Sequence, residues 1–111
     1  MTDEFLCRFE DIGEGEARSF GPFDGSRRKA FVVRKDGRLH AWWDSCPHYE
    51  TPMAWRTNAY LNAARDRIVC ASHGAEFEID TGRCVLGAAL GQELTPAPIE
   101  TRPNGELIFK R

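Results

Sequence analysis

The chain has 111 residues, of which 41% are hydrophobic, and its formal net charge is −2. This hydrophobic content supports a folded core and excludes intrinsic disorder, and the length suits a single domain over residues 1–111. The 15 basic and 17 acidic residues are dispersed along the chain, so the charge pattern offers no surface for nucleic acid or an anionic membrane.

The first ten residues, MTDEFLCRFE, lack the basic start and apolar run of a signal peptide, and no apolar stretch reaches the length of a membrane span. We therefore expect a cytoplasmic protein whose four cysteines stay free of disulfides in a reducing compartment. Cys7 is expected to be a small buried hydrophobe, whereas the sequence leaves open which side of its strand Cys84 faces.

Turn signals divide the chain into short segments in which apolar and polar residues alternate. These signals are Asp24-Gly25, Asp36-Gly37, Thr81-Gly82 and Asn104-Gly105. The first segment, FLCRFE (5–10), predicts a strand with Phe5, Cys7 and Phe9 on one face. The next, KAFVVRKDGRLHAWW (29–43), predicts two strands joined by the tight turn at Asp36-Gly37.

Two more hairpins are predicted further along, at AEFEIDTGRCVL (75–86) and at PIETRPNGELIFK (98–110). A helical turn is expected at AYLNAARD (59–66). Many short strands with regularly spaced turns are typical of a small antiparallel all-β domain. We therefore predict the all-β fold class.

Two polar segments that contain proline or glycine interrupt this strand pattern. CPHYETPMAW begins at Cys46 and follows a strand that ends near Trp43. CASHGAEF begins at Cys70, at the end of the strand-like stretch RIVC (67–70). We therefore expect the two ends of the chain to build a base sheet. Residues from about 44 to 90 would form an inserted subdomain that carries both segments.

Each of these segments offers one thiolate and one imidazole, from Cys46 and His48 in the first and from Cys70 and His73 in the second. A binuclear iron–sulfur cluster needs two protein ligands on each iron, and a Cys pair on one iron with a His pair on the other defines a Rieske [2Fe–2S] centre. The one-residue spacing of Cys46 and His48 fits, because the two side chains would bind different irons. We predict these four residues as ligands of one [2Fe–2S] cluster per chain.

A single structural zinc ion is an alternative for two cysteines and two histidines. Such zinc sites commonly use wider Cys–Cys and His–His spacings, and one intervening residue makes it awkward for Cys46 and His48 to reach the same ion. A set that binds no metal is the remaining alternative.

The residues around the two segments follow one order along the chain: Cys46-Pro47-His48, Cys70-x-x-His73-Gly74, Phe77 and Thr81-Gly82. This order resembles the Rieske ferredoxin family. The likeness extends to KDGRLHAWWDSCPH before the first motif and to IDTGRC after the second, so it covers nearly the whole chain. The resemblance implies the Rieske fold of stacked antiparallel sheets, in which the inserted cluster-binding subdomain presents its loops at an exposed tip.

The resemblance also implies a soluble one-electron carrier. It would shuttle electrons from a flavin or iron–sulfur reductase to a terminal oxygenase or other redox enzyme, docking transiently at the cluster tip. We do not expect an enzyme, because a terminal oxygenase needs a further iron site with two histidines, and His40 is the histidine left over. A small Rieske-like subunit of a nitrite reductase, and a redox-sensing or structural accessory domain, are the alternatives.

The same resemblance bears on the reduction potential. High-potential relatives in cytochrome bc complexes staple their loops with a disulfide, at positions that are Thr51 and Ser72 here. They also have a Ser and a Tyr that donate hydrogen bonds on the cluster side, where this chain has Ala75 and Phe77. We therefore expect a potential toward the low end of the Rieske range of about −150 to +300 mV.

Overall fold

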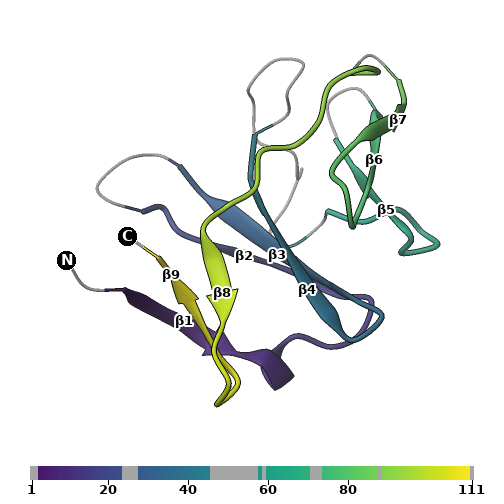
Figure 1. The fold of residues 1–111 in the computed structure, drawn as a ribbon. Helices are drawn as coiled ribbons and strands as arrows, with labels where there is room; N and C mark the ends of the chain where they lie inside the picture. The colour runs from purple at the N-terminus through teal and green to yellow at the C-terminus, as the bar shows by residue number, and fades with distance from the viewer. Residues whose placement is uncertain are drawn as a thin grey trace.

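The computed structural model describes residues 3–23, 28–45, 58, 60–70, 74–87 and 89–110, and within these ranges the chain is all-β, as predicted. The strands are β1 (Glu4–Arg8), β2 (Ala17–Phe20), β3 (Ala30–Lys35), β4 (Arg38–Trp43), β5 (Arg67–Val69), β6 (Glu76–Glu78), β7 (Cys84–Leu86), β8 (Ile99–Thr101) and β9 (Glu106–Phe109). They form three antiparallel sheets, in the orders β1–β9–β8, β2–β3–β4 and β5–β6–β7. In Figure 1 the β2–β3–β4 sheet lies between the other two.

The central sheet is built on the predicted hairpin of β3 and β4. Asp36 and Gly37 have φ values of 55° and 74°, the two positive angles that a tight I′ hairpin turn requires. Strand β3 is covered on both faces, with successive side chains alternating between cores. Phe31 and Val33 pack with the β5–β6–β7 side, while Val32 belongs to a cluster with residues of β1 and β9. The predicted turn at Asp24-Gly25 lies outside the described residues.

The base sheet joins the two ends of the chain, since β1 pairs with β9 and β9 pairs with β8. The expectation that Phe5 shares a face with Cys7 is wrong, because a bulge in β1 pairs them with adjacent residues of β9, Ile108 and Leu107. Phe5 is therefore 56% exposed, whereas Cys7 is 4% exposed and packs with Phe9 as expected. The predicted hairpin of β8 and β9, with its Asn104-Gly105 turn, is confirmed.

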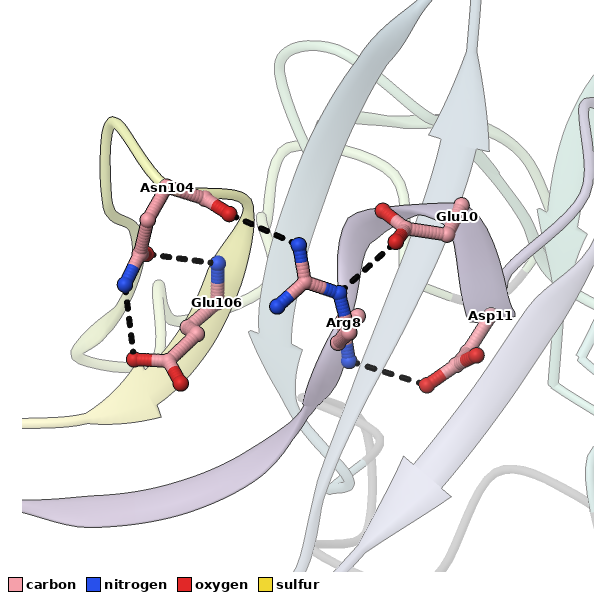
Figure 2. Close-up of polar contacts among 5 residues, drawn as sticks. All are labelled: Arg8, Glu10, Asp11, Asn104 and Glu106. Carbon is pink, nitrogen blue, oxygen red and sulfur yellow. Dashed lines mark hydrogen bonds and ion pairs between the residues drawn. The ribbon is translucent and has the colours of Figure 1, made fainter.

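Exposed polar groups fasten the β8–β9 turn to the end of β1, as Figure 2 shows. Arg8 Nε donates to Glu10 Oε1 at 2.7 Å, and Arg8 Nη2 donates to the carbonyl oxygen of Asn104 at 2.8 Å. The backbone N–H of Arg8 donates to Asp11 Oδ2 at 3.0 Å, across the short 3-10 helix η1 (Phe9–Asp11). Asn104 Nδ2 in turn donates to Glu106 Oε1 at 3.1 Å. One arginine thus links segments from opposite ends of the chain.

The third sheet, β5–β6–β7, contains the predicted hairpin with its Thr81-Gly82 turn. Gly82 has a φ of 74° and lies beneath the ring of Trp42, where an added Cβ would come within 2.7 Å of the indole. Trp42 is 7% exposed, and its Nε1–H donates to the carbonyl oxygen of Ile79 at 3.2 Å. This contact fixes the third sheet against the central one.

The prediction of a helical turn at 59–66 is wrong. The described residues of that stretch form an isolated bridge and turns. Asn62 Oδ1 accepts the backbone N–H groups of Asp66 and Arg67, at 3.0 and 3.2 Å, and Arg65 has a φ of 60°. A short side chain that bonds to nearby backbone competes with helix formation, which explains the outcome.

Cys7 and Cys84 are both buried free thiols, as expected for Cys7. Cys84 Sγ donates to the carbonyl oxygen of Leu86 at 3.3 Å, and the residue packs in the core cluster shared by the central and third sheets. In the part of the chain that the structure describes, no helix is long and apolar enough to cross a membrane.

Candidate metal centre

Of the four predicted ligands, Cys70 lies in the described part of the chain, directly after β5. Cys46, His48 and His73 lie outside it, as do Thr51 and Ser72. Within the described ranges no three His, Cys, Asp or Glu side chains gather closely enough to hold a metal ion. The ligand set and the inserted subdomain at 44–90 therefore stay predictions. The surroundings of Cys70, and of the described residues that flank 46–57, bear on them.

Cys70 is held in a tight backbone loop that connects β5 to β6. Its N–H donates to the carbonyl oxygen of Ala75 at 2.8 Å, and its own carbonyl oxygen accepts the N–H of Gly74 at 2.8 Å. Gly74 has a φ of 70°, which the absence of a Cβ makes accessible. The described residues on either side of 71–73, Cys70 and Gly74, therefore lie on fixed backbone.

The interior beside Cys70 is apolar. Cys70 and Phe77 are 0% exposed and Ala75 is 1% exposed, and all three belong to the core cluster shared with the central sheet. Ala75 and Phe77 bring no side-chain hydrogen-bond donor to this region. That agrees with the expectation of a low potential, which stays a prediction.

The first segment leaves the central sheet at the end of β4, where the backbone is fixed. Trp43 N–H donates to the carbonyl oxygen of Thr95 at 2.9 Å, and Asp44 N–H donates to that of Lys29 at 2.8 Å. On the return side, Asn58 Oδ1 accepts the backbone N–H of Ser19 at 2.7 Å. The described residues on either side of 46–57 are thus anchored on the central sheet.

Tyr60 connects the start of the first segment to the strand before Cys70. Its hydroxyl donates to Asp44 Oδ2 at 2.8 Å, and its carbonyl oxygen accepts the N–H of Val69 at 2.8 Å. Burial and the neighbouring Asp44 carboxylate raise the pKa of Tyr60 far above its usual value, against a weaker opposite effect of the Ser19 side chain. Tyr60 therefore remains a neutral phenol that can donate this bond. No sequence pattern indicates this pair, because its members are far apart along the chain.

A third segment, after β7, approaches the loop of the second motif. A Cβ on Gly87 would come within 2.9 Å of the Cα of Ala75, so the two backbones lie in close contact. Beside Gly87 are two large exposed apolar side chains, Leu86 at 52% and Leu90 at 62%. Exposed leucines of this kind stand out only once burial is known, and sequence reasoning missed them.

A hollow of about 560 Å³ lies elsewhere, where the start of β2 faces residues 61–65. Several polar groups that line it are already engaged: Arg65 Nη1 donates to the carbonyl oxygen of Gly15, and Asn62 Oδ1 accepts backbone N–H groups. The hollow contains none of the described or predicted ligands, so it does not compete with Cys70 as the candidate site.

Sequence comparison gives a match to the family described as the Rieske [2Fe-2S] domain, over residues 4–100. Apoptosis-inducing factor 3 of mouse and of human is 32% identical over 77 residues, which are 69% of this chain and 11% of those proteins. The chain thus spans about a tenth of the length of these relatives. The ferredoxin component of the alkene monooxygenase system of Xanthobacter autotrophicus is 23% identical over 95 residues, 86% of this chain and 72% of that protein.

Comparison with solved structures finds the same architecture in a complex of reduced oxygenase and oxidized ferredoxin in carbazole 1,9a-dioxygenase. The match has a TM-score of 0.72 and 22% identity, and it covers 96% of this chain and 90% of the matched one. At this identity the likeness concerns the fold, and it agrees with the three-sheet arrangement described above.

Proposed function

The chain belongs to the Rieske [2Fe-2S] domain family, and from this premise we propose that it is a one-electron carrier. It would accept electrons from a flavin or iron–sulfur reductase and pass them to a terminal oxygenase or other redox enzyme. The family match over residues 4–100 carries the proposal, because it spans both ligand motifs. The relatives named as ferredoxin components of oxygenase systems support the same role.

The donor set of the chain fits a Rieske cluster. Two cysteines and two histidines, Cys46, His48, Cys70 and His73, would hold one cluster per chain, and Cys70 is a free thiol on fixed backbone. When bound, the cluster supplies reversible one-electron chemistry. The protein would contribute the ligands as thiolates and neutral imidazoles, keep water away through the apolar interior around Cys70, and limit the hydrogen bonds that raise the potential.

We further propose that a terminal oxygenase docks on a surface beside the second motif, formed by Leu86 and Leu90. Both leucines are large and exposed, and Gly87 between them lies against Ala75. An apolar patch next to the redox centre suits a small interface that forms and separates quickly. The protein itself would carry no substrate site and would act in the cytoplasm, as the sequence led us to expect.

The experiment that tests the function is the analysis of anaerobically purified protein. We expect two irons and two sulfides per chain, a reddish-brown oxidised form, and an EPR signal of low average g after dithionite reduction. A redox titration should give a potential toward the low end of about −150 to +300 mV. A colourless protein with one tightly bound zinc would contradict electron transfer and favour the accessory-domain alternative. Tight, constitutive association with a nitrite reductase would favour the subunit alternative.

The docking proposal has its own test in two charge substitutions. We expect Leu86→Asp and Leu90→Asp to slow electron transfer to the terminal oxygenase by about 5- to 30-fold, because each puts a charge into an apolar contact. The potential should change little, since neither residue is a predicted ligand and water screens a charge at these exposed positions. Phe5→Asp is the matched control, because Phe5 is as exposed, at 56%, but belongs to the base sheet. Equal slowing by all three variants would place docking elsewhere.

A further inference from the structure

We propose that Tyr60 is a positioning residue that sets the spacing of the two cluster-ligand segments through its hydrogen bond to Asp44. This inference rests on the proposed function, because it concerns how the chain holds Cys46 and Cys70 for a cluster. It assigns a role in cluster binding to a residue that lies outside both motifs.

The contacts of Tyr60 reach both motifs at nearly the same distance along the chain. Its hydroxyl donates to Asp44 Oδ2 at 2.8 Å, and Asp44 stands two residues before Cys46. Its carbonyl oxygen accepts the N–H of Val69 at 2.8 Å, and Val69 stands directly before Cys70. One residue therefore links the entrances of both ligand segments through two hydrogen bonds.

Tyr60 is itself held rigidly. It is 2% exposed, and its ring stacks on the ring of Phe31 with the centroids 4.1 Å apart and an angle of 10° between the planes. Phe31 is fully buried in the central strand β3. The ring cannot swing away without unpacking the core, so the hydroxyl is kept at the distance that Asp44 requires.

Asp44 is fixed from its other side as well, since its backbone N–H donates to the carbonyl oxygen of Lys29 at 2.8 Å. The bond between Tyr60 and Asp44 thus joins two positions that are already ordered, and it ties the exit of β4 to the strand that leads to Cys70. Ligands held in place before a metal centre binds lose less freedom on binding, and groups that orient ligands commonly affect metal affinity about 10- to 100-fold.

The test is the rate at which the holoprotein loses its cluster. Tyr60→Phe removes the hydroxyl but keeps the ring stack and the backbone bond to Val69. We expect iron release to an anaerobic chelator to become about 10- to 100-fold faster, with a changed visible circular dichroism spectrum and a broader EPR signal.

The matched control is Thr81→Val, which removes another hydroxyl bond to a carboxylate. Thr81 Oγ1 donates to Glu78 Oε1 at the same 2.8 Å, but at the far end of β6 from Cys70. We expect this variant to release iron at the wild-type rate and to keep the wild-type spectra. If Tyr60→Phe behaves like Thr81→Val, or loses thermal stability while its cluster stays as firmly bound, the positioning role is refuted.

Two substitutions of Asp44 give a second route that does not depend on Tyr60→Phe folding well. Asp44→Asn keeps an oxygen that can accept from the phenol and should retain the wild-type release rate and spectra. Asp44→Leu removes the acceptor and should reproduce the effect of Tyr60→Phe. Equal effects of the two Asp44 variants would contradict the proposal. A wild-type protein that binds no cluster would overturn both the proposed function and this inference. If the wild type binds its cluster, and Tyr60→Phe and Asp44→Leu release iron at the wild-type rate, the inference alone is overturned.

Discussion

The two ends of the molecule both tie together parts of the chain that are far apart in sequence, but by different means. At the base, Arg8 reaches Glu10 and the Asn104 carbonyl through exposed contacts, with side-chain exposures of 46% for Arg8 and 63% for Glu10. Beside the candidate metal centre, Trp42 makes a buried bond and Tyr60 a partly buried one, from side chains that are 7% and 2% exposed.

This contrast indicates where a substitution will be tolerated. An exposed ion pair competes with water and is screened by salt, so its loss costs little. A buried hydrogen bond cannot exchange its partner for water, so removing one side leaves a desolvated polar group. We therefore expect the base sheet to accept changes that the site end of the molecule does not.

The largest expected contrast is between the cysteines of the two ends. Cys70→Ala should abolish cluster binding, because it removes a predicted ligand, whereas Cys7→Ala should leave the iron and sulfide content unchanged. Cys7 lies in the base half, and burial raises the pKa of its thiol, which works against the thiolate that a metal needs. Iron and sulfide analysis with visible absorption measures the outcome.

Cys84→Ala is the sharper control for that comparison. Cys84 is a buried thiol in the same sheet as the second motif, and its Sγ donates to the carbonyl oxygen of Leu86. We expect it to keep the cluster and to lose about 1 kcal/mol of stability from the small cavity. Loss of the cluster in Cys84→Ala or Cys7→Ala would mean that the predicted ligand set is wrong.

An intermediate loss of stability is expected when the turn glycines of the two ends, Gly82 and Gly105, are replaced by alanine. Gly82→Ala should destabilise by about 2 to 4 kcal/mol, because φ is 74° and the new Cβ would meet the Trp42 ring at 2.7 Å. Gly105→Ala, at a φ of 88°, meets only the movable ends of Arg8 at 3.2 Å and Glu10 at 3.6 Å, and should cost about 1 to 2 kcal/mol. Urea unfolding followed by far-UV circular dichroism compares the two. Equal losses would show that the close approach of Trp42 to Gly82 is of no consequence.

Much of this fold was predictable from local sequence, because its hairpins are encoded by their turns. Asp36-Gly37 has two residues suited to positive φ between alternating strands, and the structure gives it those angles. The base strand β1 was predicted correctly, but the side that Phe5 takes was predicted wrongly, since a bulge depends on the pairing partner. The helical turn predicted at 59–66 was wrong for a similar reason. The composition of this stretch permits a helix, but the side chain of Asn62 accepts backbone hydrogen bonds that stabilise a turn.

The residues of the candidate site likewise fall into two groups, those that the sequence indicates and those that it does not. The paired Cys-x-His and Cys-x-x-His motifs name their residues directly, and the family match is consistent with that interpretation. The contact of Tyr60 with Asp44, and the exposure of Leu86 beside the second motif, depend on how distant segments pack. No pattern of short range in a single sequence could indicate them.

The smallest expected effect concerns Glu10 at the base. The hydrogen bond from Arg8 lowers the pKa of the Glu10 carboxyl below its usual value in the folded protein. A carboxyl whose pKa is depressed by folding stabilises the protein above its ordinary pKa, and this contribution is lost as the pH falls through the folded value. Glu10→Gln should therefore unfold slightly more easily than the wild type near neutral pH, and the difference should vanish in acid.

Thermal unfolding at several pH values, each with low salt and with about 1 M salt, measures this difference. Salt should remove it at neutral pH, because both partners of the ion pair are largely exposed. The matched variant at the other end is Tyr60→Phe, which removes the partly buried bond to Asp44, and its loss of stability should respond little to salt. A Glu10→Gln effect that survives both acid and high salt would mean that the base, like the site end, depends on bonds that water cannot replace.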